Sequence, residues 1–150
     1  MRSFVRLLVT ALAMWTAALS AADVPPAGTI QQDGTTLAWK PAAAPFPPGM
    51  ETVVLEGDPR TGEIFTLRLR APAGARLAPH VHPLPERVTV IQGAIGVGFG
   101  TAYDQTRMRV FRAGDYYVNP PGAPHFVGFI EDSVLQVTGR GPWGVEWVSP

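Results

Sequence analysis

Apolar and polar residues alternate along most of the chain beyond Met50, which is the pattern of β-strands with one buried side. In the run Gly62–Arg70, for example, Phe65, Leu67 and Leu69 point to one face and their neighbours to the other. Pro or Gly interrupts every later stretch that is long enough to form a helix. About nine short strands at this spacing predict an all-β barrel or sandwich. The other predicted strands are Thr52–Leu55, Arg87–Gln92, Ile95–Phe99, Met108–Phe111, Tyr116–Val118, Phe126–Ile130, Val134–Thr138 and Trp143–Val148.

The first residues have the pattern of a secretory signal peptide. Arg2 and Arg6 precede the apolar run Leu7–Leu19, which is shorter than the roughly 20 residues of a membrane-spanning helix. Small residues follow, and we predict cleavage after Ala22, with cleavage after Ser20 as the close alternative. An uncleaved membrane anchor is the weaker interpretation. The mature protein is therefore predicted to be exported to a bacterial periplasm or secreted, with no membrane attachment after the signal is removed.

Residues 23–50 are rich in proline, which lacks the hydrogen-bond donor that sheets and helix interiors require. This segment is predicted to be an extended N-terminal arm that packs on the domain or on a partner subunit. Leu37 and Trp39 alternate with polar neighbours and predict one short strand within it. The predicted organisation is a signal peptide at 1–22, an arm at 23–50 and a single β-barrel domain at 51–150.

Composition narrows the possible functions. Hydrophobic residues make up 46% of the 150 residues and charged residues 16%, so the chain can build a core and is not disordered. Twelve basic and twelve acidic residues give no net charge, which argues against a nucleic-acid partner or an acidic lipid surface. Cysteine is absent, which excludes disulfides, thiol catalysis and thiolate metal ligands.

All three histidines of the chain fall into one pattern with a glutamate. His80 and His82 are two residues apart on a predicted strand, so their imidazoles leave the same face. A turn at Pro83–Pro85 is expected to reverse the chain and bring Glu86 back beside the two rings, and His125 could join them from an adjacent strand. Three imidazoles and one carboxylate suit divalent Mn, Fe, Co, Ni, Cu or Zn, whereas Ca and Mg prefer oxygen ligands. An H-x-H pair alone more often packs or faces water, so histidines used only for packing are the alternative.

This pattern of histidines and glutamate resembles the sequence motifs of a known family, the cupins. The first cupin motif, G(x)5HxH(x)3E(x)6G, is reproduced with its spacing intact by Gly74, His80, His82, Glu86 and Gly93. Most of the second motif, G(x)5PxG(x)2H(x)3N, is reproduced by Gly114, Pro120, Gly122 and His125, with Phe129 in place of the final Asn. The resemblance covers Gly74 to Phe129. The tail Gly141–Gly144 also looks like that of small exported cupins.

The resemblance implies a double-stranded β-helix, or jelly-roll, barrel whose divalent transition metal (Fe, Mn, Zn, Ni or Cu) is held by His80, His82, Glu86 and His125. Because Phe129 replaces the usual Asn, the lining near the metal should be more apolar than usual, with Val127 and Phe129 as candidate lining residues. A homodimer is a further expectation that rests on the family alone.

Three functions remain open. The first is a small-molecule metalloenzyme of dioxygenase, isomerase or lyase type, with a slight preference for dioxygenase. Its ligand would be small and anionic, because a divalent ion and one glutamate leave a charge of +1. The second is a non-catalytic module that binds or senses a metabolite or metal, and the third is a structural barrel without metal.

Other polar residues are weaker candidates. Arg68 and Arg70 are interpreted as solvated strand residues rather than an anion site. The side of the strand on which Tyr116, Tyr117 and Gln136 lie is left open.

Overall fold

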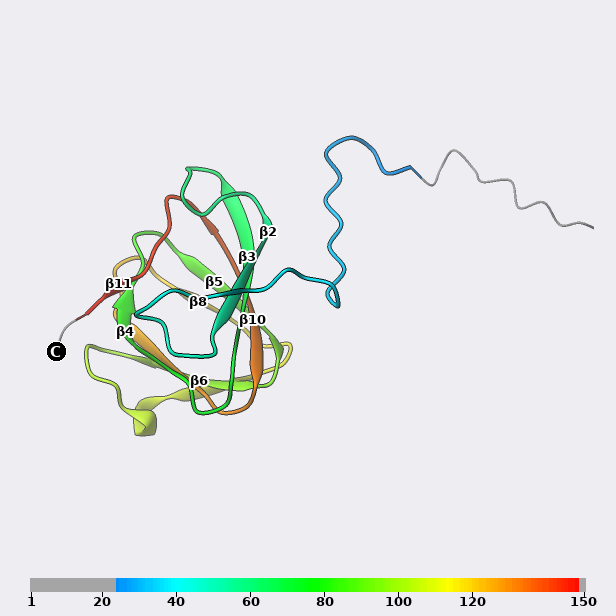
Figure 1. Ribbon diagram of the computed structural model, residues 1–150. Helices are drawn as coiled ribbons and strands as arrows, with labels where there is room; N and C mark the ends of the chain where they lie inside the picture. Colours follow the sequence, from blue (N-terminus) through cyan, green and yellow to red (C-terminus); the bar gives the residue numbers. More distant parts are fainter. Residues whose placement is uncertain (1–23, 149–150) are drawn as a thin grey trace, which may run out of the picture. The chain divides into compact units, whose positions relative to one another are not determined.

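The predicted strands form two antiparallel sheets in the computed structural model, which describes residues 24–148 (Figure 1). The residues from Gln31 onward make up one compact unit that contains every described strand. The strands are β1 (Lys40–Pro41), β2 (Glu51–Glu56), β3 (Ile64–Ala71), β4 (Arg76–Val81), β5 (Glu86–Gln92), β6 (Ala94–Phe99), β7 (Arg109–Arg112), β8 (Tyr116–Asn119), β9 (His125–Phe129), β10 (Ser133–Arg140) and β11 (Glu146–Trp147). One turn of 3₁₀ helix, η2 (Gln105–Arg107), lies between β6 and β7.

The two sheets have the orders β1-β2-β3-β10-β5-β8 and β11-β4-β9-β6-β7. Some strands that are neighbours in the sequence, such as β4 and β5, therefore lie in different sheets, as expected of a jelly roll, whereas β2 and β3 pair within one sheet. The prediction of an all-β jelly-roll fold is confirmed. The sheets remain separate, so the form is a sandwich and not a closed barrel.

Alternation along the strands buries one apolar face of each sheet against the other. On β10, for example, every second residue from Ser133 to Gly139 is buried and the residues between them are partly exposed. The side chains that form the core are Met50, Phe65, Leu67, Ala71, Leu77, Val88, Val90, Ile95, Val97, Phe111, Val127, Phe129, Leu135 and Val137. These residues come from both sheets, so each sheet depends on the other for the burial of its apolar face.

Two predicted strands are placed differently. The amide of Trp39 donates to the carbonyl of Leu37 in a tight local turn, so the short strand of the arm is β1 at Lys40–Pro41 and not Leu37–Trp39. At the other end, Trp143 donates its amide to Pro59 in a loop, and only Glu146–Trp147 of the predicted strand Trp143–Val148 pairs with a neighbour.

The proline-rich arm is partly integrated into the sandwich. β1 pairs with β2, and Met50, only 2% exposed, lies inside the core. Ala42 and Phe46 also pack against the core. Residues 31–50 are thus part of the compact unit and not an independent extension.

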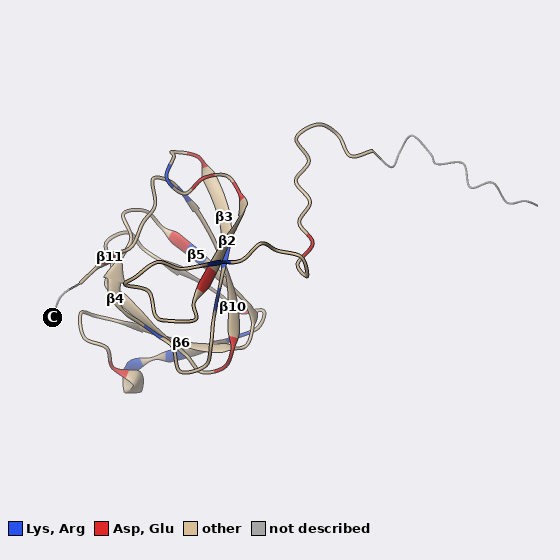
Figure 2. Cartoon of the chain, viewed as in Figure 1, with Lys and Arg blue, Asp and Glu red and all other residues tan. Residues whose placement is uncertain are grey.

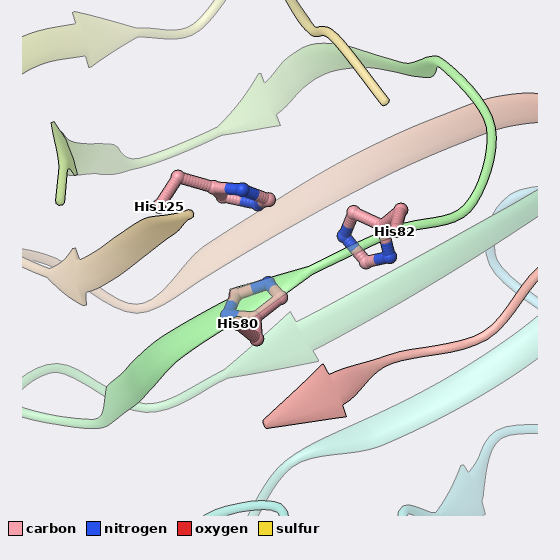
Figure 3. Close-up of side chains that lie close together, drawn as sticks. All are labelled: His80, His82 and His125. Carbon is pink, nitrogen blue, oxygen red and sulfur yellow. The ribbon is translucent and has the colours of Figure 1, made fainter. Parts of the chain in front are cut away.

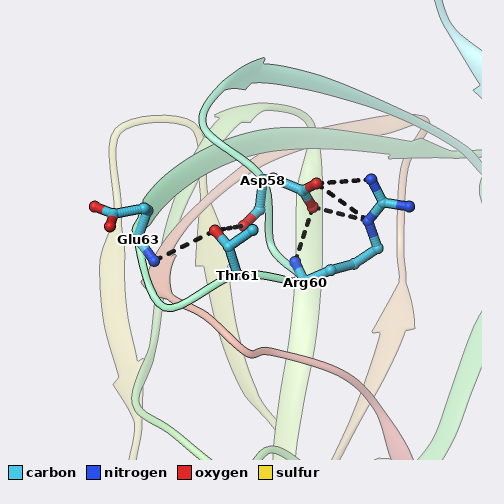
Figure 4. A network of polar contacts seen from close by, with 4 residues as sticks. All are labelled: Asp58, Arg60, Thr61 and Glu63. Carbon is cyan, nitrogen blue, oxygen red and sulfur yellow. Dashed lines mark hydrogen bonds and ion pairs between the residues drawn. The ribbon is translucent and has the colours of Figure 1, made fainter.

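Charged residues of both signs are spread over the strands and loops (Figure 2). The loop between β2 and β3 is an example, where the carboxylate of Asp58 accepts hydrogen bonds from the guanidinium and the amide of Arg60 (Figure 4). These bonds to Arg60 lower the pKa of Asp58 to about 2. Because this pair is exposed to solvent, it contributes little to stability.

The predicted signal peptide lies outside the described residues. Within residues 24–148, no helix has the length and apolar character needed to cross a membrane.

Candidate metal centre

The three histidines converge from two paired strands of one sheet (Figure 3). His80 lies on β4 and His125 begins β9, and the pairing of these strands places the two residues directly opposite each other. His82 follows the last residue of β4. One ring nitrogen from each histidine lies within 4.8 Å of the other two, and none of the three residues is more than 3% exposed. The sequence prediction that His125 joins the H-x-H pair from an adjacent strand is confirmed.

Main-chain carbonyl groups orient all three rings. The Nδ1 atoms of His80, His82 and His125 lie 2.7, 2.7 and 3.0 Å from the carbonyl oxygens of Ala78, Gly144 and Ala123, respectively. Because a carbonyl oxygen can only accept, each Nδ1 carries a proton and donates it. In the neutral ring the Nε2 atom then has a free lone pair, which is the form in which histidine binds metals.

Glu86 reaches the histidines from the opposite sheet. As expected, the strand that follows Pro83–Pro85 brings Glu86 beside the rings, but the chain crosses there from β4 in one sheet to β5 in the other and does not return next to β4. Glu86 is the first residue of β5, and its Oε2 lies 3.3 Å from Nε2 of His82 and 3.5 Å from Nε2 of His125. Glu86 is only 7% exposed, so its carboxylate lies in the interior and faces the rings.

The charge states of these groups favour a bound cation. Burial, together with the neighbouring His125, lowers the pKa of His80 to about 4, so this ring is neutral near pH 7. Burial acts to raise the pKa of Glu86, but the nearby rings of His125 and His82 outweigh it and the pKa is lowered. Burial likewise acts against a charge on His82, but the carboxylate of Glu86 outweighs this and raises its pKa. The centre therefore holds an ionised buried carboxylate, which requires a positive partner.

The free ring nitrogens identify where that positive partner belongs. Nε2 of His82 and Nε2 of His125 are buried and have no hydrogen-bond partner. If both rings are neutral, these two acceptors face an acceptor oxygen of Glu86, an arrangement that is unfavourable unless a proton or a metal cation lies between them. Three imidazole nitrogens and one carboxylate suit a divalent transition metal. The residues present thus match such an ion.

Three contributors to the site were missed by the sequence analysis. Asn119 ends β8 opposite Glu86 and donates from Nδ2 to Oε2 of Glu86 at 2.8 Å. Trp143 stacks on the ring of His82 with centroids 4.6 Å apart and planes at 15°. Gly144 supplies the carbonyl that orients His82. Asn119 directly follows the predicted strand Tyr116–Val118, but the sequence left open which side of that strand faces inward, and a main-chain contact such as that of Gly144 leaves no trace in the sequence.

The two candidate lining residues, Val127 and Phe129, both lie in the core between the sheets and are each 3% exposed. Aromatic rings that lie near the histidines instead belong to Trp143, Trp147 and Phe99. A role of Val127 and Phe129 beside a bound metal stays a prediction.

The weaker candidates are largely used in structural contacts. Arg70 pairs with Glu51 at 2.6 Å, and Arg68 donates to the side chain of Gln136 at 3.1 Å. Tyr116 is 55% exposed, whereas Tyr117 packs against the core beside Phe111. Burial, with the charge of Glu86, raises the pKa of Tyr117, so its phenol stays protonated.

Comparisons with known proteins agree with this architecture. Solved structures with the same fold include the polyketide cyclase RemF from Streptomyces resistomycificus, at 17% identity over 81% of this chain and 87% of that one, with a TM-score of 0.68. An acetylacetone dioxygenase from Acinetobacter johnsonii matches at 22% identity over 80% of this chain and 78% of that one, with a TM-score of 0.61.

Among curated proteins, Germin-like protein 5-1 from Oryza sativa subsp. japonica is 42% identical over 57 residues, which are 37% of this chain. The match spans only 25% of that relative's length. A sequence profile of the ChrR cupin-like domain covers residues 29–144, well over half of the 150 residues. Together with the jelly-roll sandwich and the two cupin motifs, this match shows that the chain belongs to the ChrR cupin-like family.

Proposed function

We propose that the protein binds one divalent transition metal ion through Nε2 of His80, His82 and His125 and the carboxylate of Glu86. The observation that carries the proposal is the set of three rings whose Nδ1 protons are all donated to carbonyl groups, which leaves the Nε2 lone pairs free, with those of His82 and His125 beside a buried carboxylate. A metal cation satisfies these acceptors and the carboxylate together, whereas a metal-free cluster must place a proton on a buried ring beside Glu86.

We further propose that the metal centre serves a small-molecule metalloenzyme of dioxygenase, isomerase or lyase type. When bound, such an ion supplies Lewis-acid or dioxygen chemistry. This chain's own residues hold the ion, exclude bulk water and leave a net charge of +1 in an apolar interior, which favours a small anionic ligand with oxygen donors. The fold shared with an acetylacetone dioxygenase supports the dioxygenase type, because acetylacetone as its enolate is such a ligand.

A second candidate is a non-catalytic cupin that binds or senses a metal or small ligand. It is favoured by the burial of the centre, since His80, His82, Glu86 and His125 are between 1% and 7% exposed. An enzyme must admit its substrate, so its metal spectrum should respond to added small carboxylates or enolates. A binder that holds only metal should show no such response.

The first experiment measures metal content per chain in mature protein that is purified without affinity tags or chelators. We expect close to one equivalent of a transition metal, and its loss in His82→Ala. Phe129→Leu is the control for a change in the buried core that spares every proposed ligand. If the wild type carries no metal and takes up none of the divalent ions offered, the metal proposal is wrong and the histidines serve packing.

Export to the periplasm and homodimer formation remain our predictions from the sequence and the family resemblance. Intact mass of the protein recovered from the periplasm would show cleavage after Ala22 or after Ser20. Light scattering of the mature protein would give its oligomeric state, and a monomer at all concentrations would contradict the homodimer.

A further inference from the structure

Asn119 is a buried polar residue that neither cupin motif includes. It is 1% exposed and lies on β8, whose pairing with β5 sets it directly opposite Glu86. Its Nδ2 donates to Oε2 of Glu86 at 2.8 Å, and this is the same oxygen that lies 3.3 and 3.5 Å from the ring nitrogens of His82 and His125. Asn119 thus contacts the one carboxylate oxygen on which the centre converges.

From this contact we propose that Asn119 is a positioning residue, which fixes the carboxylate of Glu86 as a metal ligand. The proposal rests on the proposed function, because it assigns Asn119 a role only at a metal centre formed by Glu86 and the histidines.

The terminal torsion of a glutamate is broad, so the backbone of β5 does not set the orientation of this carboxylate. The Nδ2 donor supplies that orientation. An amide is also neutral and gives up no proton, so Asn119 can stabilise the ionised carboxylate without competing with the metal for charge. Without this donor, Glu86 would be free to rotate away from the ion or to accept a proton.

A structural role alone explains Asn119 poorly. Its second polar atom, Oδ1, is buried and has no hydrogen-bond partner. Burying an amide with one half unsatisfied costs free energy, and an apolar side chain at this position would avoid that cost. The contact of Nδ2 with Glu86 explains why an amide stands at this position. The amide orientation follows from this contact, since only the NH₂ group can donate to a carboxylate.

The experiment is a double-mutant cycle on cobalt binding. Co²⁺ affinity is measured by chelator competition, together with the visible absorption spectrum, for wild type, Asn119→Leu, Glu86→Gln and the double variant. Loss of a group that orients a ligand typically weakens metal binding by about 10–100-fold, and we expect this for Asn119→Leu with an altered spectrum. In the Glu86→Gln background, the same change should alter affinity less than about threefold, because the carboxylate through which Asn119 acts is gone.

Tyr117→Phe is the matched control, since it removes one polar group from the neighbouring inward position of β8 and should leave the cobalt affinity and spectrum unchanged. Circular dichroism and the melting temperature of the metal-free variants report folding separately. If the leucine variant does not fold, Asn119→Ala, which adds no volume, takes its place in the cycle with the same expected loss.

The outcomes separate the two proposals. Wild type that binds no Co²⁺ or other divalent ion would refute the metal centre itself. Wild type that binds Co²⁺ while Asn119→Leu keeps the same affinity and spectrum would overturn only the role of Asn119. An equal loss in the wild-type and Glu86→Gln backgrounds would also overturn it, because Asn119 would then act independently of the carboxylate.

Discussion

Glu86 is the only proposed ligand that carries a charge, and its substitution tests the centre most directly at the scale of one residue. Glu86→Gln keeps the shape of the side chain and removes its negative charge. We expect the variant to lose metal to a competing chelator at least about tenfold more readily than wild type, because it lacks a charged ligand. Phe129→Leu, a change in the core, should retain metal much better. Equal retention in wild type and Glu86→Gln would remove Glu86 from the centre.

Glycines of the cupin motifs offer a second test at this scale. Gly93 has φ +80°, and a Cβ there would meet the carbonyl oxygen of Asp132 and the hydroxyl of Ser133. Gly74 has φ +83° but open space around it, and Gly62 has open space with no positive φ. Strain at positive φ costs about 1–2 kcal/mol, and steric overlap with backbone adds to it.

Substitution by alanine should therefore lower the free energy of unfolding in a fixed order. We expect about 0–0.5 kcal/mol for Gly62→Ala, about 1–2 kcal/mol for Gly74→Ala and more than about 3 kcal/mol for Gly93→Ala. Urea denaturation of the three variants measures this order. Equal losses for Gly74→Ala and Gly93→Ala would show that the close approach of Asp132 to Gly93 is not maintained in solution.

The sequence identified some residues of the site and missed others, and the difference follows from the kind of contact that each residue makes. His80, His82, Glu86 and His125 could be proposed because their types and spacing carry the chemistry themselves. Asn119 and Trp143 act on other side chains, and their partners are set by strand register and loop packing that only the fold reveals. Gly144 acts through its carbonyl group, which every residue possesses.

At the scale of elements, alternation predicted most strands but could not show which strands pair. The segment from β4 to Glu86 reads equally well as a hairpin and as a crossing between sheets, because both need a short proline-containing turn between two alternating runs. The structure has the crossing. Because the chain crosses between the sheets, Glu86 approaches the histidines from the opposite sheet and not from a strand next to β4.

The C-terminal segment is the element whose importance the sequence understated. β11 pairs with β4, which places Trp147 opposite His80. Trp143 stacks on the ring of His82, and the carbonyl of Gly144 accepts a hydrogen bond from the same ring. This segment therefore supports two of the three histidines.

Two truncations separate the contributions of this segment. A chain that ends at Gly144 loses β11 but keeps Trp143 and an acceptor for His82, whereas a chain that ends at Pro142 loses both. We expect the shorter chain to bind Co²⁺ about 10–100-fold more weakly than the chain that ends at Gly144, as measured by chelator competition. The same affinity in the two truncated chains would show that the orientation of His82 does not depend on Trp143 and Gly144.

At the scale of the whole molecule, the proposed ligands belong to both halves of the sandwich. The three histidines lie on or beside β4 and β9 in one sheet, and Glu86 lies on β5 in the other. A bound ion would therefore join the two sheets, in addition to the apolar core that already holds them together. Metal binding should then stabilise the whole molecule and not only the loops around the site.

This coupling gives a quantitative prediction. At a free metal concentration 100 times the dissociation constant, wild type should gain about 2.7 kcal/mol of unfolding free energy. If Glu86→Gln binds tenfold more weakly, the same concentration should stabilise it by about 1.4 kcal/mol. Urea denaturation with and without metal measures both values.

Hydrogen exchange tests the same coupling strand by strand. In wild type, metal should add protection to β5 and β8 as well as to β4 and β9. In Glu86→Gln, metal should protect chiefly β4 and β9. Equal stabilisation and equal protection in the two proteins would mean that the ion is held by the histidine-bearing sheet alone, without Glu86 as a ligand.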